Sequence, residues 1–174
     1  MLKKWTYPLL VLVILVASGY FLPSPFKARL DTKFCAFCER EILNRQKFYE
    51  DDLVIALYTH KPVVEGHFLI IPKRHVERFE MLSNEEVLQM NQVIKKVHQA
   101  SMQTFGTNSY LLLQKNGAEV GQTVPHVHIH YMGRKAGEGS TLGFMIKMLI
   151  TPLLSPISIE TMSLLTQKMH VAMH

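Results

Sequence analysis

The sequence predicts an α+β domain in which one long helix packs against an antiparallel sheet of about five strands. Short apolar or alternating segments, typical of strands, lie both before and after one long segment with helical spacing. A parallel sheet would require strands that alternate regularly with helices, and this alternation is missing. The chain of 174 residues is long enough for one such domain with a hydrophobic core.

The N-terminal residues 1–22 have the composition of a membrane segment. Lys3 and Lys4 precede a stretch without charge, from Trp5 to Leu22, and this length is near the lower limit for crossing a bilayer. The segment is either a signal peptide or an uncleaved signal anchor. We expect a single-pass anchor; a buried N-terminal helix is the alternative. The two lysines favour a cytoplasmic N-terminus and an extracytoplasmic domain.

Residues 23–33 contain two prolines and are expected to link this anchor to the folded domain, which is predicted to span residues 34–134. A short helix is predicted near its start. Two strands joined by an acidic turn should follow, and then a strongly apolar strand that ends at a proline. These elements are expected at residues 38–44, 48–52, 53–57 and 68–71.

The long helix has clear signals at both ends. Ser83 and Glu86 form a capping box, and Gly106 is suited to end the helix. Between them the apolar side chains keep helical spacing at Val87, Met90, Val93, Ile94 and Val97. The last two strands of the sheet are expected at residues 110–113 and 127–131.

Residues 135–174 are predicted to form a helical extension. The segment 142–154 is mostly apolar and carries one charge, Lys147, but it is too short to span a bilayer. It is expected either to pack on the domain or to lie in the membrane interface. The apolar stripe from Ile159 to Ala172 predicts a packing helix.

Composition narrows the function classes. The net charge is +5, with no dense block of lysine and arginine, so binding of a nucleic-acid duplex is not expected. This mild basic character suits a phosphate-bearing ligand or an anionic membrane. The two cysteines, Cys35 and Cys38, are compatible with half of a zinc site, a redox pair or a disulfide.

The most informative segment is His-Val-His-Ile-His at residues 126–130. Side chains on a strand alternate between its two faces. We therefore expect His126, His128 and His130 on one face, with Val127 and Ile129 on the other. Because imidazole is a nucleophile, a proton shuttle and a metal ligand near neutral pH, this face predicts chemistry.

Four blocks in the same order resemble the histidine triad (HIT) family. They are the segment around the three histidines (121–132), Gly66 to His75, the cysteine pair within 34–38, and Asn116-Gly117. The resemblance covers about residues 34–134. It implies a HIT-like nucleotide-binding domain that is usually a homodimer, whose relatives hydrolyse or transfer nucleotidyl groups at an α-phosphate.

The resemblance also implies roles for individual residues. His128 would be the nucleophile that forms a phosphohistidine intermediate, and His130 and His67 would assist it. Asn116, Gln122 and Thr123 would supply neutral donors to phosphate oxygens. The remaining set would bind a structural zinc ion; it comprises Cys35, Cys38, His75 and His126.

One departure from the family weakens the expectation of an adenosine substrate. Related hydrolases carry a carboxylate near Thr59 that contacts the ribose hydroxyls, and this chain has none there. Two alternatives to an enzyme therefore stay open: a non-catalytic, zinc-stabilised nucleotide-binding module at the membrane, and a thiol redox protein. The second lacks the strand and helix context of a thioredoxin-like unit.

Overall fold

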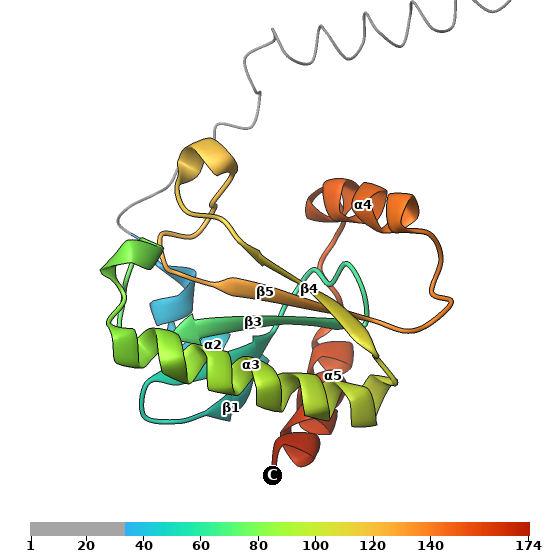
Figure 1. The fold of residues 1–174 in the computed structure, drawn as a ribbon, viewed down its shortest axis with the longest axis horizontal. Helices are drawn as coiled ribbons and strands as arrows, with labels where there is room; N and C mark the ends of the chain where they lie inside the picture. Colours follow the sequence, from blue (N-terminus) through green and yellow to red (C-terminus); the bar gives the residue numbers. More distant parts are fainter. Residues whose placement is uncertain (1–33) are drawn as a thin grey trace, which may run out of the picture.

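The computed structural model describes residues 34–174 and has an α+β architecture (Figure 1). The five strands form one antiparallel sheet in the order β1-β2-β3-β5-β4, which confirms the predicted sheet. Their bounds are Lys47–Glu50 (β1), Val54–Tyr58 (β2), Gly66–Pro72 (β3), Ser109–Gln114 (β4) and Ile129–Arg134 (β5). The predicted anchor at residues 1–22 and the linker at 23–33 lie outside the described residues.

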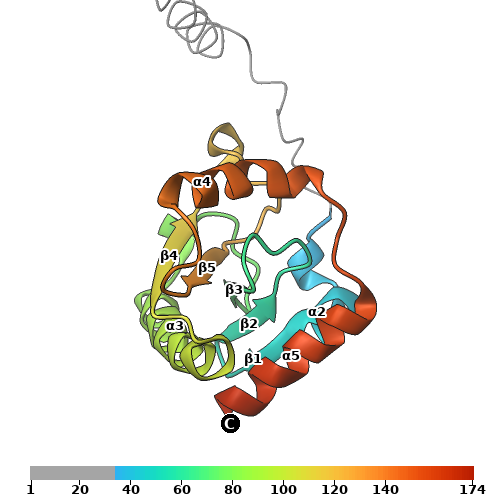
Figure 2. The same cartoon turned by 90° about the vertical axis from the view of Figure 1, so that its right-hand side faces the viewer.

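Two helices cover one face of the sheet, α3 (Asn84–Phe105) and α5 (Ile159–Met173) (Figure 2). Period-two alternation sends Ala56, Phe68 and Tyr131 into this layer, where they meet Val93 of α3 and the two buried methionines of α5. The predicted packing helix is therefore present, although Ile159 at its start is 67% exposed.

The opposite face is covered by smaller elements. The short helices η1 (Ala36–Cys38) and α2 (Arg40–Gln46) pack near Leu57 and Leu69. Helix α4 (Thr141–Ile150) packs through Phe144 against Met132 of β5, and η4 (Thr151–Leu153) follows it. Within residues 34–174, no helix is both long enough and apolar enough to cross a membrane. The division of the chain at residue 134 stays a prediction.

The long helix begins and ends where its capping signals predict. The Ser83 hydroxyl accepts from the backbone N–H of Glu86, and the Glu86 carboxylate accepts from the backbone N–H of Ser83. Arg74 adds a bidentate contact to this carboxylate. At the other end Gly106 adopts a left-handed conformation with a φ of 67°.

The last strand begins later than the sequence predicts. β5 starts at Ile129, whereas residues 126–128 lie outside the ladder. The His126 carbonyl accepts from the side chain of His128, and the Val127 N–H donates to the Val76 carbonyl. These backbone groups are engaged elsewhere, so the sheet pairing cannot extend through them.

Candidate active site and metal centre

The three histidines share one side of the chain, as the alternation predicts. Val127 is fully buried in the core between the sheet and the helix layer, and Ile129 packs against that core. His128 and His130 instead line a cavity of about 1030 Å³, which is also lined by residues of η1, α2 and α5. The imidazole rings of His128 and His130 have centroids 5.1 Å apart.

A backbone carbonyl determines the tautomer of His128. Its Nδ1 lies 2.7 Å from the His126 carbonyl oxygen, so Nδ1 carries the proton and donates. Nε2 therefore carries the lone pair, which is the form that a nucleophilic imidazole requires. Burial and the nearby positive charge of Lys115 lower the pKa of His128. The ring is held neutral at physiological pH.

His67 and His130 form a second oriented pair. The Val63 N–H donates to His67 Nδ1 at 3.1 Å, so the His67 proton is on Nε2. That nitrogen donates to His130 Nδ1 at 2.9 Å, which leaves the His130 proton on Nε2. Burial lowers the pKa of His67 to about 4 and that of His130 to about 2. His130 is thus a neutral hydrogen-bond donor beside the lone pair of His128.

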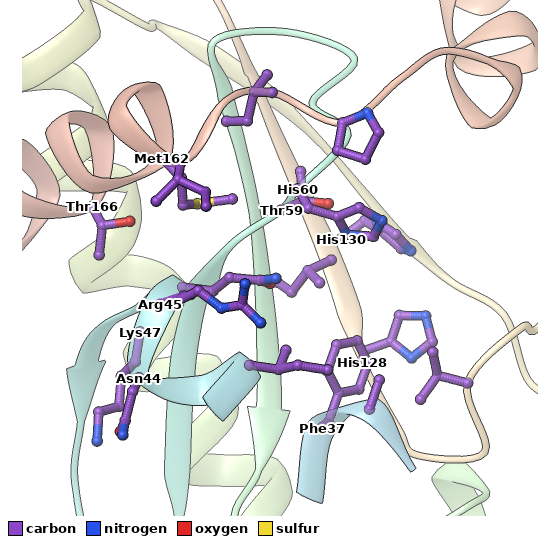
Figure 3. A pocket seen from close by; sticks show the side chains of 18 of the residues that line it. Phe37, Asn44, Arg45, Lys47, Thr59, His60, His128, His130, Met162 and Thr166 are labelled. Carbon is purple, nitrogen blue, oxygen red and sulfur yellow. The ribbon is translucent and has the colours of Figure 1, made fainter. Parts of the chain in front are cut away.

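Phe37 of η1 packs against the ring of His128. Its ring meets the His128 ring edge to face, with centroids 5.2 Å apart. Figure 3 shows His128 and His130 on one side of the cavity, while Arg45, Lys47 and Thr166 lie on the other.

The three predicted phosphate-side residues have different surroundings. Thr123 lines the cavity. Gln122 is buried, where its Oε1 accepts from the Gly117 N–H at 2.7 Å and its Nε2 donates to two carbonyls. Asn116 accepts from the Phe79 N–H and donates to Glu80. Neither Gln122 nor Asn116 is among the described residues that line the cavity.

Phe37, Lys115 and His60 also line the cavity, and they were not predicted as site residues. Phe37 lies between the two cysteines of the predicted metal site, and Lys115 directly precedes Asn116, a predicted phosphate-side residue. Both are therefore next to residues that the sequence did identify. Lys115 places a cation beside the two histidines. His60 follows Thr59 at the end of β2, and burial lowers its pKa. Thr59 itself lines the cavity, with no carboxyl group at this position.

The four predicted metal ligands converge. Their ligand atoms all lie within 4.8 Å of one another. Cys38 Sγ is 3.3 Å from His75 Nδ1 and 3.8 Å from His126 Nδ1. Cys35 Sγ is 3.4 Å from His126 Nδ1. A tetrahedral zinc ion with Zn–S of about 2.3 Å and Zn–N of about 2.0 Å separates its ligand atoms by about 3.3–3.8 Å. The donor set therefore fits zinc.

Hydrogen bonding orients the ligands as well. His126 Nε2 donates to the Pro72 carbonyl at 2.9 Å, which leaves Nδ1 free to bind metal. Burial lowers the pKa of His126 to about 4, so its ring is neutral. Burial and Cys38 raise the pKa of Cys35 to about 12. A metal ion bound here must displace that thiol proton.

Comparison with known proteins identifies relatives of the domain. The HIT domain family model matches residues 40–137. An uncharacterized HIT-like protein of Methanocaldococcus jannaschii is 33% identical over 114 residues, which cover 63% of this chain and 86% of that protein. The bifunctional bis(5'-adenosyl)-triphosphatase/adenylylsulfatase FHIT of Arabidopsis thaliana is 38% identical over 104 residues, which cover 59% of this chain.

The chain spans 57% of the length of the plant enzyme. Among solved structures, a HIT-like protein from Bartonella henselae is similar with a TM-score of 0.60 and 25% sequence identity. The match covers 73% of this chain and 85% of that one. Nucleotide hydrolases are therefore homologues of this protein.

Proposed function

The chain belongs to the HIT family, and we propose that it is a nucleotidyl hydrolase or transferase that acts at the α-phosphate of a nucleotide conjugate. The observation that carries the proposal is the pair of oriented imidazoles in the cavity. One presents a lone pair, at His128 Nε2, and its neighbour presents a proton, at His130 Nε2. A nucleophile beside a neutral donor suits attack on phosphorus with charge building on its oxygens.

In the proposed reaction His128 Nε2 forms a bond to the α-phosphorus while the bond from phosphorus to the leaving group breaks. The leaving group takes that electron pair. His130 donates to a phosphate oxygen or to the leaving group, and Lys115 offsets the negative charge of the phosphates. A water molecule, or another acceptor in a transferase, then attacks the phosphorus and gives up a proton to solvent. The bond to Nε2 breaks, and its electron pair returns to Nε2, which regenerates His128.

We propose a structural zinc ion on Cys35, Cys38, His75 and His126. All four positions are filled by protein ligands, as in structural rather than catalytic zinc sites. When bound, the ion cross-links η1 to the segment that carries the histidines. It would fix Phe37 and the His126 carbonyl, and both of these contact His128.

We also propose a homodimer, as the family resemblance implies. The strand β4 supports it, because it lies at the edge of the sheet formed by residues 34–174 and its side chains at Tyr110, Leu111 and Leu112 are exposed. Light scattering of the purified chain should give twice the mass of one chain, and a mass of 20.0 kDa would contradict the dimer.

The enzyme proposal is tested by His128→Ala. With diadenosine triphosphate, adenylyl sulfate and a nucleoside phosphoramidate as substrates, the variant should lose on the order of 10³-fold or more in kcat. His174→Ala, at an exposed C-terminal histidine, is the matched control and should keep wild-type turnover. Substrate labelled at the α-phosphate should transfer label to the wild-type chain and not to His128→Ala.

The alternative outcome is equally clear. If His128→Ala hydrolyses these nucleotides at the wild-type rate, His128 is not the nucleophile and the proposed reaction is wrong. If the wild-type chain binds these nucleotides but hydrolyses none, the protein is a nucleotide-binding module. Thr59 and the engaged side chain of Asn116 are the features that would then explain the missing activity.

A further inference from the structure

Helix α4 and η4 present an apolar surface to solvent, which we call the α4 surface. Leu149, Leu142 and Leu153 are 80%, 71% and 68% exposed. Only the inner side of α4 is packed, through Phe144 and Met148. Seven exposed residues of α4, η4 and the residue after it are apolar, namely Leu142, Met145, Ile146, Leu149, Ile150, Leu153 and Leu154. Thr141 and Lys147 are also exposed on α4.

An ordinary surface helix has the opposite pattern, with polar residues on its outer side. The segment 141–158 contains no acidic residue, and its one charged side chain is Lys147. It also lies beyond residues 40–137, which match the HIT domain family model. A contiguous exposed apolar surface of this kind marks an interaction site.

The length of α4 restricts the partner. Ten residues of helix extend about 15 Å, half of the hydrocarbon thickness of a bilayer. The helix can lie in the interface of a membrane but cannot cross it. A helix in the interface buries its apolar side to a depth of about 5–10 Å below the headgroups.

The N-terminal sequence favours a bilayer as that partner. Residues 5–22 carry no charge, and 23–33 form a linker of eleven residues that reaches at most about 40 Å. A chain anchored through residues 5–22 would hold the domain close to the lipid surface. We propose that the α4 surface lies on the phospholipid bilayer and orients the domain there. The proposal depends on the anchor predicted from the sequence and is independent of the enzymatic proposal.

The orientation has a consequence for the cavity. Figure 2 shows α4 on the side of the sheet opposite α3 and α5. Pro152 of η4 both lines the cavity and has a carbonyl that accepts from Lys61 at 2.9 Å. The surface proposed to face the bilayer therefore borders the cavity that contains the histidines.

Tryptophan fluorescence tests the proposal on the full chain. Trp5 is the single tryptophan, so a Trp5→Phe background allows one probe to be placed at will. Leu149→Trp puts it on the α4 surface. Val171→Trp, at a site 71% exposed on α5, is the matched control. Both chains are reconstituted into phosphatidylcholine and phosphatidylglycerol vesicles with and without brominated acyl chains.

We expect the Leu149→Trp emission to shift to shorter wavelength in vesicles and to be largely quenched by the brominated lipid. The Val171→Trp emission should stay at the wavelength typical of water and unquenched. A blue-shifted but unquenched Leu149→Trp signal would overturn the proposal, because protein, either residues 5–22 or a second copy, would then cover the surface. Emission typical of water, or a chain that does not bind vesicles, would also overturn it.

Discussion

Lowering the pH should destabilise the fold through His67, by an amount that follows from its environment. His67 is 4% exposed, and its Nδ1 accepts a hydrogen bond from the Val63 N–H. A second proton on the ring would have no acceptor there. Burial lowers the pKa of His67 from 6.5 to about 4, so the unfolded chain binds this proton more tightly than the folded chain does.

The sign and the size follow from linkage. Above the unfolded pKa of 6.5, His67 is neutral in both states and does not reduce the stability of the fold. As the pH falls toward the folded pKa of about 4, the unfolded chain takes up the proton first and the fold loses stability. The complete shift corresponds to about 3 kcal/mol. Between about pH 8 and about pH 5, His67 alone should reduce the free energy of unfolding by about 2 kcal/mol.

Urea unfolding at these two pH values measures the effect. Other groups titrate in the same range, so the comparison is between the wild-type chain and His67→Gln, which keeps polar atoms but has no titrating group. The pH-dependent loss should be smaller in the variant by about 2 kcal/mol. Equal losses in the two proteins would refute the reasoning, because His67 would then have the same pKa folded and unfolded.

Gly133→Ala should cost about 1–3 kcal/mol in the same unfolding assay, because the new Cβ would lie 2.9 Å from Thr107 Cγ2; an unchanged midpoint would mean that this contact relaxes freely. Ser83→Ala removes the hydroxyl that caps α3 and should cost about 1 kcal/mol, whereas Ser83→Asp should retain most of the stability. Cys38→Ser should lower the zinc bound per chain by native mass spectrometry, and retention of wild-type zinc would argue against the proposed site. Zinc uptake by the wild-type chain should release protons, detectable with a pH indicator, because the pKa of the Cys35 thiol is raised to about 12.

The features that were predictable from the sequence depend on neighbours along the chain. The capping residues Ser83 and Glu86 are three positions apart, and Gly106 terminates the same helix. The prediction that His128 and His130 share one face required only the two-residue period of side chains along an extended chain. Local signals of this kind determine an element before any tertiary contact forms.

Other features depend on residues that are distant in sequence. The Asn116 amide is hydrogen-bonded to Phe79 and Glu80, more than thirty positions earlier. No pattern of neighbouring residues could predict that these groups would bind the amide in place of a phosphate. The start of β5 was predicted two residues early because the His128 side chain takes the His126 carbonyl. Likewise, the contribution of Thr166 in α5 to the cavity depends on how the C-terminal helix folds back over the sheet.

The sequence determines where the histidines are. The fold determines which ring nitrogen of each histidine is hydrogen-bonded, and therefore which nitrogen carries the proton. The occupying partners are main-chain groups in three of the four cases, namely the Val63 N–H at His67 and the carbonyls of Pro72 and His126 at His126 and His128. Every amino acid at these partner positions would present a carbonyl, and every one except proline would present an N–H. The proposed division into metal ligand, nucleophile and hydrogen-bond donor therefore depends on the backbone path and tolerates change in the partners' side chains. His130 is the exception, because its tautomer is set by the imidazole of His67. A change at residue 67 would therefore alter the proton position on His130 and leave the lone pair of His128 in place.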